Sequence, residues 1–214
     1  MEKYNYVIIV AGGSSIKEGI SLGLWDKIKD KNVWSINYAF MTMNFLPKAQ
    51  CWVDISFFKN NIDRLQLLCM SGVSCHTKAH PKYATIKEIH CHPTSRDPLD
   101  VGKIFIGRMG LSGFFTLSLA VKEGFDEIYL LGYDFGSVTD DNKTHYYQGE
   151  INVISSGVGK PNLYRTGTQP KDEIKDFEVF LKYPIKIINV SLKSKIDYFE
   201  KIDYNEFFKR IGEQ

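Results

Sequence analysis

The segment most informative about the fold is Tyr6-Val7-Ile8-Ile9-Val10-Ala11-Gly12-Gly13-Ser14-Ser15. Its first five residues form a continuous, largely β-branched apolar run, which is typical of a strand buried on both faces of a parallel sheet. Gly12 to Ser15 predict a tight turn after that strand. Ser15 followed three residues later by Glu18 matches a capping box, which predicts that a helix starts at the turn. The first unit is therefore a strand, a glycine turn and a helix that includes Trp25 and Ile28.

The same alternation continues along the chain. Further strands are predicted at 33–36, 51–55, 73–76, 88–91, 127–131 and 185–190. Helices are predicted at 38–46, 57–68, 111–123, 171–181 and 204–210. This order predicts a Rossmann-like, doubly wound α/β fold with a mainly parallel sheet, in a single domain of residues 1–214. Residues 136–168 have little apolar periodicity and are predicted to form a lid.

Composition excludes some classes of function. The 214 residues include 27 Lys and Arg against 25 Asp and Glu, and a net charge of +2 is too small for a nucleic-acid-binding surface. No apolar run approaches the roughly 18 residues of a membrane span, and the N-terminus does not resemble a signal peptide. Four cysteines in such a chain do not indicate a disulfide framework. We therefore expect a reducing, cytoplasmic location.

Small or polar residues follow four of the predicted strands. They are Gly12 to Ser15 after the first strand, Asn37 after the second, Asp54 near the end of the third, and Gly132 with Asp134 after the strand at 127–131. Because ligands of open parallel sheets bind beyond the carboxyl ends of the strands, these residues predict a ligand site at that edge.

Each of these residues also has a purely structural interpretation. The glycine turn can admit a phosphate at a helix N-terminus, but it matches neither the Walker nor the full dinucleotide pattern. Alternatively, its glycines only allow a tight turn from the strand to the helix. Asn37 can bind a base or ribose, or cap a helix. Asp54 and Asp134 can bind a metal or ribose or act as a base; alternatively, Asp54 caps the next helix and Asp134 orders a turn.

Two further groups of residues carry possible chemistry. Residues 69–92 contain four histidines and three cysteines, but their spacing does not match the paired ligands of zinc sites, so ordinary strand-edge residues are favoured and no metal site is predicted. His145, in the predicted lid, is a candidate general base, although a lone loop histidine is more often simply solvated.

Several segments together resemble the family-42 bacterial sialyltransferases, which bind CMP-sialic acid in a Rossmann-like fold. They are Val7 to Glu18, the Ile36-Asn37 step, Ser112-Gly113-Phe114 and Glu127 to Phe135. Gly132 to Phe135 with Asp141 to His145, and the ending 189–202, are also similar to a sister group of archaeal 6-hydroxymethylpterin diphosphokinase-like proteins and motility accessory factors.

The resemblance implies roles for particular residues. It implies nucleotide phosphate and ribose contacts near Gly13, Ser15 and Asn37, with Ser112 and Gly113 at the next loop, and it places Asp54 where the sister group commonly has Asp. Gly12 and Ser14, in the same turn, are also taken as nucleotide-binding residues. The catalytic histidine of the sialyltransferases corresponds to Thr168 here, and a tyrosine that supports the leaving phosphate corresponds to Gly136. We therefore take His145, Asp134 and Tyr147 as the candidate catalytic residues, with Tyr146 and Tyr164 as further candidates in the lid.

Three hypotheses follow. The leading one is a glycosyltransferase that uses a nucleotide sugar, with a CMP-sugar favoured, an unknown acceptor and no required cofactor. The second is a pyrophosphoryl transferase that uses ATP and Mg2+, in which Asp54 and Asp134 would be metal ligands. The third is a nucleotide-binding protein without catalysis. The resemblance also implies a possible homo-oligomer.

Overall fold

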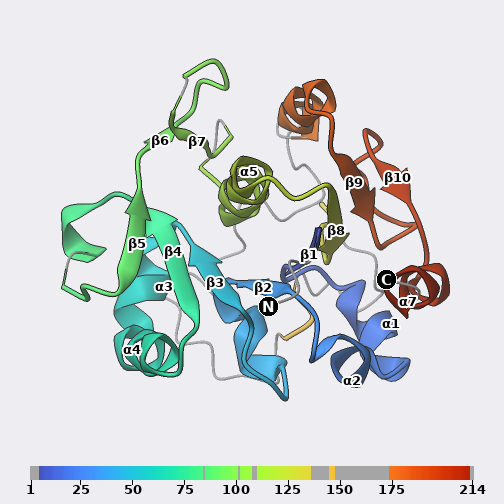
Figure 1. The fold of residues 1–214 in the computed structure, drawn as a ribbon, viewed down its shortest axis with the longest axis horizontal. Coiled ribbons are helices and arrows are strands. Elements are labelled where there is room, and N and C mark those ends of the chain that lie inside the picture. Colours follow the sequence, from blue (N-terminus) through green and yellow to red (C-terminus); the bar gives the residue numbers. More distant parts are fainter. Residues whose placement is uncertain are drawn as a thin grey trace.

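The computed structural model describes residues 5–83, 85–100, 102–107, 110–135, 145–147 and 174–212. An eight-stranded sheet in the order β10-β9-β8-β1-β2-β3-β4-β5 forms the centre of the molecule (Figure 1). All neighbouring strands in this sheet run parallel. Its strands are β1 (Tyr6–Val10), β2 (Val33–Ile36), β3 (Ala49–Trp52), β4 (Ser74–Lys78), β5 (Ile89–His92), β8 (Glu127–Leu131), β9 (Lys186–Asn189) and β10 (Glu200–Lys201). A separate pair joins β6 (Thr94–Ser95) to β7 (Ile104–Phe105).

The strand order reverses between β1 and β8. The chain builds outward from β1 to β5, returns across the sheet through α5 (Ser112–Glu123), and adds β8 on the other side of β1. The two strands pair in register from Tyr6 with Glu127 to Val10 with Leu131, so their carboxyl ends lie side by side. Such a reversal is the position at which doubly wound sheets bind ligands.

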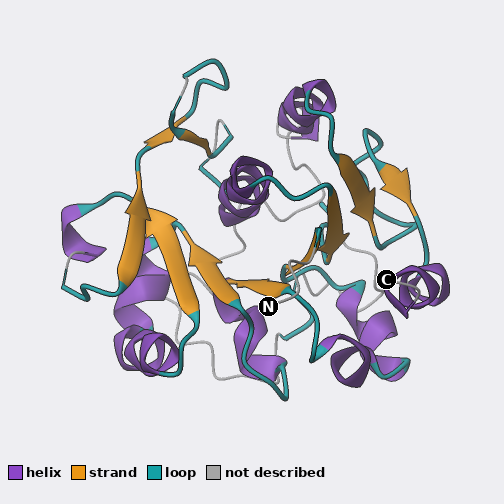
Figure 2. Cartoon of the chain, viewed as in Figure 1, coloured by secondary structure: helices purple, strands orange, loops and turns teal. Residues whose placement is uncertain are grey.

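Helices cover both faces of the sheet (Figure 2). In the view of Figure 1, α5 lies above the sheet, and the other labelled α-helices lie below it. The latter are α1 (Ile16–Ser21), α2 (Leu24–Ile28), α3 (Ile55–Asn60), α4 (Ile62–Met70) and α7 (Tyr204–Gly212). The 3-10 helices are η1 (Asn37–Thr42), η2 (Pro81–Tyr83) and η3 (Asp176–Lys182). Among the residues with described placement, no helix is long and apolar enough to cross a membrane.

Both faces of β1 are buried, which explains why its sequence is apolar. Val7 and Ile9 pack in the core on the α5 side, whereas Tyr6, Ile8 and Val10 pack in the core under α1, α2 and α7. All five side chains are buried. Because alternate side chains point to opposite faces, a strand with helices on both sides has no polar face, and each buried aliphatic side chain contributes about 1.5–3 kcal/mol.

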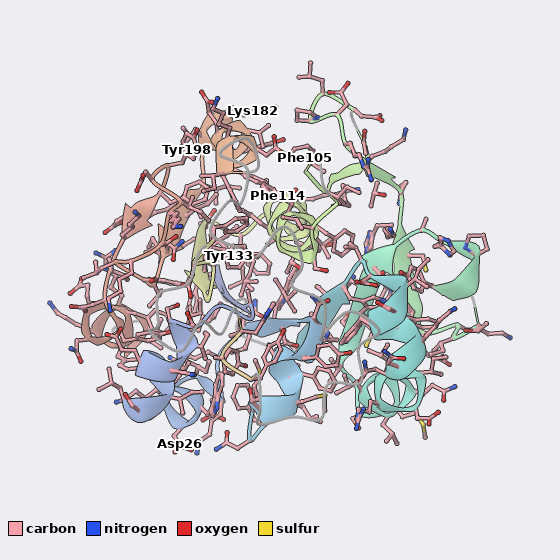
Figure 3. All side chains as sticks on the ribbon, turned by 180° about the vertical axis from the view of Figure 1, so that it is seen from behind. Asp26, Phe105, Phe114, Tyr133, Lys182 and Tyr198 are labelled. Atoms are coloured by element: carbon pink, nitrogen blue, oxygen red, sulfur yellow. The ribbon has the colours of Figure 1, made fainter. Side chains whose placement is uncertain are left out.

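Aromatic side chains fill the core on the α5 side. The rings of Phe114 and Phe177 stack with centroids 4.2 Å apart, and Phe105 meets Phe114 edge-on at 5.9 Å. Figure 3 shows Phe105, Phe114 and Tyr133 gathered around α5. Such pairs add stability beyond the area they bury, so this cluster fixes α5, and with it the start of α5, against the sheet.

The predicted α/β fold is confirmed, and the differences concern mainly helices. A helix begins with Ser15 as its N-cap residue, as the capping box predicted, but the Ser15 side chain makes no cap hydrogen bond. The first helix divides into α1 and α2 at Gly23, whose φ is +80°. The helix predicted at 57–68 divides at Asn61, and the one predicted at 38–46 is the shorter 3-10 helix η1. The third strand ends earlier than predicted, and β6, β7 and β10 were missed because two residues carry no periodic signal.

Candidate functional site

The turns that follow β1 and β8 are hydrogen-bonded to each other at the strand reversal. The Gly13 amide donates to the Gly132 carbonyl oxygen at 2.9 Å, and the Ser15 amide donates to Asp134 Oδ2 at 2.8 Å. A Cβ at Gly13 would lie 2.3 Å from the Gly132 oxygen and 2.6 Å from Asp134 Oδ2, which no side chain allows. Glycine is therefore required for this contact, and two amides of the predicted phosphate turn donate to the protein itself.

Asp134 is buried between these turns. It is 2% exposed, and its backbone carbonyl accepts a 3.0 Å hydrogen bond from the Lys195 amide. Burial raises the pKa of the Asp134 carboxyl, and nearby groups of Ser15, Ser191 and Ser14 oppose that rise. Burial disfavours the charged carboxylate. In this structure Asp134 holds the turn after β1, which is the structural role considered for it from the sequence.

Asn37 and Ser112 form a second part of the same edge. Asn37 has a φ of +51°, an unusual value for a residue other than glycine. The Ser112 hydroxyl donates to Asn37 Oδ1 at 3.2 Å and accepts the Val53 amide at 3.2 Å, while Gln50 Nε2 donates to the Asn37 carbonyl at 2.9 Å. Asparagine adopts this conformation more readily than other residues with a side chain, so its place at this turn is consistent with the backbone that the site requires.

The start of α5 lies beside Asn37. No side chain caps it, because its N-cap residue is Leu111. Gly113, in its first turn, packs against Tyr133, and a Cβ there would lie 3.2 Å from the Tyr133 ring. The uncapped amides of a twelve-residue helix carry the partial positive charge of its dipole, which suits an anion such as a phosphate.

Residues 145–147 lie over the glycine turn. The Tyr146 amide donates to the Gly12 carbonyl at 3.0 Å, and its buried hydroxyl is 2.6 Å from Thr42 Oγ1. A Cβ at Gly12 would meet His145 Cδ2 at 2.4 Å and the Tyr147 hydroxyl at 2.9 Å. The structure therefore brings His145 and Tyr147 to the first glycine of the turn, with Tyr146 as their anchor.

Asp54 follows β3 as predicted but is committed to local hydrogen bonds. It is exposed, and its Oδ1 accepts the Ser56 amide at 2.7 Å and the Ser56 hydroxyl at 2.6 Å. It is thus the N-cap of α3, which confirms the structural alternative considered for it. The rest of the predicted lid, including Gly136, Tyr164 and Thr168, lies outside the described residues.

Three of the four histidines of residues 69–92 pack together on β4 and β5: His76, His90 and His92. His76 Nδ1 is 3.0 Å from His92 Nε2, and the rings of His76 and His90 stack at 4.9 Å. Burial, with smaller contributions from His92 and His90, lowers the pKa of His76 to about 4. Within the described part of the chain, no group of three or more His, Cys, Asp or Glu residues is arranged to hold a metal ion.

Cysteine chemistry does not contribute to this edge. All four cysteines are free, and Cys51 and Cys75 are buried. Burial raises the pKa of Cys51 to about 12, so its thiol remains protonated at neutral pH. A thiol in that state is a small apolar core residue rather than a nucleophile.

Some residues near the turns were not predicted as site residues. Ser191 follows β9 and lies near Asp134, and Tyr204 of α7 lies near Ser15. Thr42 and Gln50 fix Tyr146 and Asn37 through the hydrogen bonds above. Ser191 lies in the 189–202 segment that carries the second resemblance, whereas the other three lie outside every motif, and only the fold brings the four to the site. A cleft of about 590 Å³ lies elsewhere, between the β6–β7 region and η3, and none of the predicted site residues lines it.

No family model and no curated protein sequence matches the chain. A solved structure, the monofunctional alpha-2,3-sialyltransferase Cst-I from Campylobacter jejuni, matches with a TM-score of 0.56 and 11% sequence identity. The match covers 93% of this chain and 80% of that chain. At this identity the likeness establishes the fold, and the chain shares the α/β, Rossmann-like fold of a sialyltransferase.

Proposed function

We propose that the protein is a glycosyltransferase that binds a nucleotide sugar at the carboxyl edge of the sheet. The observation that carries this proposal is the convergence of Gly12, the Asn37–Ser112 pair and residues 145–147 from separate segments of the chain. These groups meet beside the strand reversal, which is the ligand position of doubly wound sheets. The shared fold of a sialyltransferase supports the same reaction class.

The donor phosphate is assigned to the start of α5. The Gly13 and Ser15 amides already donate to the β8 turn, whereas α5 begins without a side-chain cap. The Ser112 hydroxyl donates to Oδ1 of Asn37 and so orients the Asn37 side chain. The amide nitrogen of Asn37 is therefore the group assigned to contact a base or ribose. A CMP-sugar is the favoured donor, because the sequence resembles enzymes that use CMP-sialic acid.

The reaction requires an acceptor hydroxyl to lose its proton as a nucleotide phosphate leaves. The acceptor oxygen forms a bond to the anomeric carbon, and the bond from that carbon to the donor phosphate oxygen breaks. His145 is assigned as the base that takes the acceptor proton, and the first-turn amides of α5 stabilise the phosphate that departs with the electron pair. Tyr147 packs against His145, with ring centroids 5.2 Å apart, and positions it.

The Mg2+ and ATP alternative has less support from the same residues. That reaction would use Asp54 and Asp134 to hold the metal ion. Asp54 caps α3 through Ser56, and Asp134 is buried and bonded to the Ser15 amide. One oxygen of each carboxyl is therefore already used within the protein, and the glycosyl-transfer proposal requires neither carboxyl as a ligand.

A thermal-shift panel tests the donor class. We expect CMP or a CMP-sugar at 100 times its Kd to raise the melting temperature by roughly 5–11 °C in the presence of EDTA, since saturation at that level contributes about 2.7 kcal/mol. UDP, GDP and ADP forms are the matched comparisons. A shift that occurs only with ATP and Mg2+ would instead identify the pyrophosphoryl transferase. If a nucleotide binds but is not consumed, the protein is a nucleotide-binding protein without catalysis.

His145→Asn tests the assigned base. We expect nucleotide release from the donor to fall by about 10²–10⁴-fold, because a positioned base contributes that much, while the melting temperature stays within about 2 °C. The measurement is the rate of CMP release with an acceptor present. His90→Asn, at an exposed position of β5, is the control and should keep the full rate. Equal rates for both variants would exclude His145 as the base.

A further inference from the structure

Two polar side chains are buried within the otherwise apolar strands β2 and β3. They belong to Ser35 and Gln50, which are cross-strand partners in register, and both residues are fully buried. A buried polar side chain costs free energy unless its polar atoms find hydrogen-bond partners, and apolar side chains here would avoid that cost. The hydrogen bonds of this pair lead to Asn37, at the end of β2.

The Gln50 amide is oriented by its two partners. Its Nε2 donates to the Asn37 carbonyl oxygen at 2.9 Å. A backbone carbonyl oxygen can only accept, so the Gln50 atom that faces it must be the amide nitrogen. The Gln50 Oε1 accepts from the Ser35 hydroxyl. Both ends of the amide are therefore used, and one of them holds the backbone of Asn37.

The side chain of Asn37 is held from a different direction. The Ser112 hydroxyl at the start of α5 donates to Asn37 Oδ1 at 3.2 Å, and the Ser112 oxygen accepts the Val53 amide at 3.2 Å. With the bond from Gln50, both oxygens of Asn37 have donors within the protein. The polar side-chain atom that these bonds leave for a ligand is Asn37 Nδ2, which can only donate.

The bond from Gln50 matters because of the backbone conformation of Asn37. Its φ of +51° lies in the left-handed region, which few residues other than glycine adopt, although asparagine tolerates it. The direction of a side chain depends on the φ and ψ of its residue. Because Gln50 fixes the peptide group of Asn37, it also fixes the direction in which Nδ2 points.

We propose that Gln50 is a positioning residue that holds Asn37 as a donor-only contact for the nucleotide. Gln50 is buried beneath the edge of the sheet and acts through Asn37. The proposal rests on the proposed function and deepens it, because a hydrogen-bond donor selects ligand atoms that accept. In a nucleotide these are the carbonyl oxygens and unprotonated ring nitrogens of the base, and the ribose and phosphate oxygens.

Gln50→Met tests the positioning role. The variant removes both polar ends of the amide and keeps a side chain of similar length. We expect it to bind CMP about 3–10-fold more weakly than the wild type, since a misdirected Asn37 loses roughly one hydrogen bond. In turnover, we expect a higher KM for the CMP-sugar with kcat within about 2-fold of wild type, because Asn37 contacts the donor equally before and during the reaction.

Cys75→Ser is the matched control. Cys75 is the in-register neighbour of Gln50 on β4 and is also fully buried. The change disturbs the packing of the sheet beside Gln50 but leaves the bond between Gln50 and Asn37. We expect it to bind CMP as the wild type does. Equally weak binding by Cys75→Ser and Gln50→Met would overturn the specific role of Gln50, and so would full affinity in Gln50→Met.

Asn37→Gly shows whether Gln50 acts through Asn37. Glycine adopts a left-handed backbone without steric cost, so the variant removes only the side chain. We expect Gln50→Met to weaken CMP binding no further when Asn37→Gly is also present, because the contact that Gln50 positions is already lost. If the two variants instead weaken binding by the product of their separate factors, Gln50 acts on the nucleotide by another route and the proposal is overturned.

The side-chain amide signals of Asn37 in an NMR spectrum give a readout that needs no nucleotide. Their loss in Asn37→Gly identifies them. We expect Gln50→Met to shift these signals and Cys75→Ser to leave them in place. Ser35→Ala, which removes the hydroxyl bonded to Gln50, is the substitute if Gln50→Met does not fold, and we expect it to shift the same signals. Unmoved signals would overturn the hold of Gln50 on Asn37. Shifted signals in a protein whose wild type binds no CMP would support that hold and contradict the proposed function.

Discussion

Asp134→Ala is expected to lower the melting temperature by roughly 6–12 °C and to abolish donor binding. The variant leaves the Ser15 amide without its acceptor at a buried position and opens a cavity between the two turns. An unpaired buried donor and a cavity together cost about 3 kcal/mol, and each kcal/mol lowers the melting temperature of a chain of this size by about 2–4 °C. Calorimetry and CMP titration would measure both losses.

Asp134→Asn is the matched variant, because its amide oxygen can still accept the Ser15 amide. The pKa of Asp134 is raised by burial, so the folded chain keeps the proton to a higher pH than the unfolded chain does. The protonated carboxyl therefore stabilises the folded chain fully at a pH below the pKa that Asp134 has in the unfolded chain. This stabilisation is lost as the pH rises through the pKa that Asp134 has in the folded chain. We therefore expect the melting temperature of the Asn variant, relative to wild type, to increase as pH rises from about 4 to 7.

Two outcomes would contradict this account of Asp134. A relative melting temperature that is flat with pH, or falls, would show that the folded state stabilises the charged carboxylate. An Asn variant that binds CMP normally but turns over no donor would show that Asp134 takes part in the reaction, as one interpretation of the sequence predicted, rather than holding the turn alone.

Gly13→Ala and Gly12→Ala are expected to fail in different ways. A Cβ at Gly13 would lie 2.3 Å from the Gly132 carbonyl oxygen, a backbone atom that cannot move without separating the β1 and β8 turns. We expect a loss of about 3 kcal/mol or more, and a melting temperature at least roughly 6 °C lower, in a thermal unfolding experiment.

The three atoms nearest to a Cβ at Gly12 would instead belong to the side chains of His145 and Tyr147. Side chains can shift more easily than backbone, so we expect Gly12→Ala to fold with a smaller loss of melting temperature than Gly13→Ala. Displacing the assigned base by about 1 Å reduces turnover on the order of 10²-fold, which a CMP-release assay would detect. Gly212→Ala, in α7 with nothing within 4 Å of the added atom, is the control for both variants.

Together, the two glycine variants test the contact of Gly13 with Gly132 and the proposed role of residues 145–147. Equal melting temperatures for the two variants would contradict the close contact of Gly13 with Gly132. Full turnover by Gly12→Ala would show that residues 145–147 do not act at the turn.

Local sequence determined the parallel sheet. The β1, β2 and β8 strands are predicted at their observed residues, because a strand covered on both faces is largely apolar, and a short apolar run shows this in the sequence of each. The same strands end in small or polar residues, which predicted where the site lies. The α5 helix was equally readable, since its apolar run ends at Gly124, which has a left-handed φ of +82°.

The tertiary structure decided what the polar residues at that edge do. Ser15 and Glu18 match a capping box, yet the Ser15 amide donates to Asp134, 119 residues away in the chain. The contact of Tyr146 with Thr42, 104 residues apart, is equally invisible in sequence. A buried polar group forms its hydrogen bond with a partner that the fold buries beside it. Which groups are buried together depends on how all the segments pack. A local motif fixes a backbone conformation; the partner of each buried polar atom is fixed only when distant segments meet.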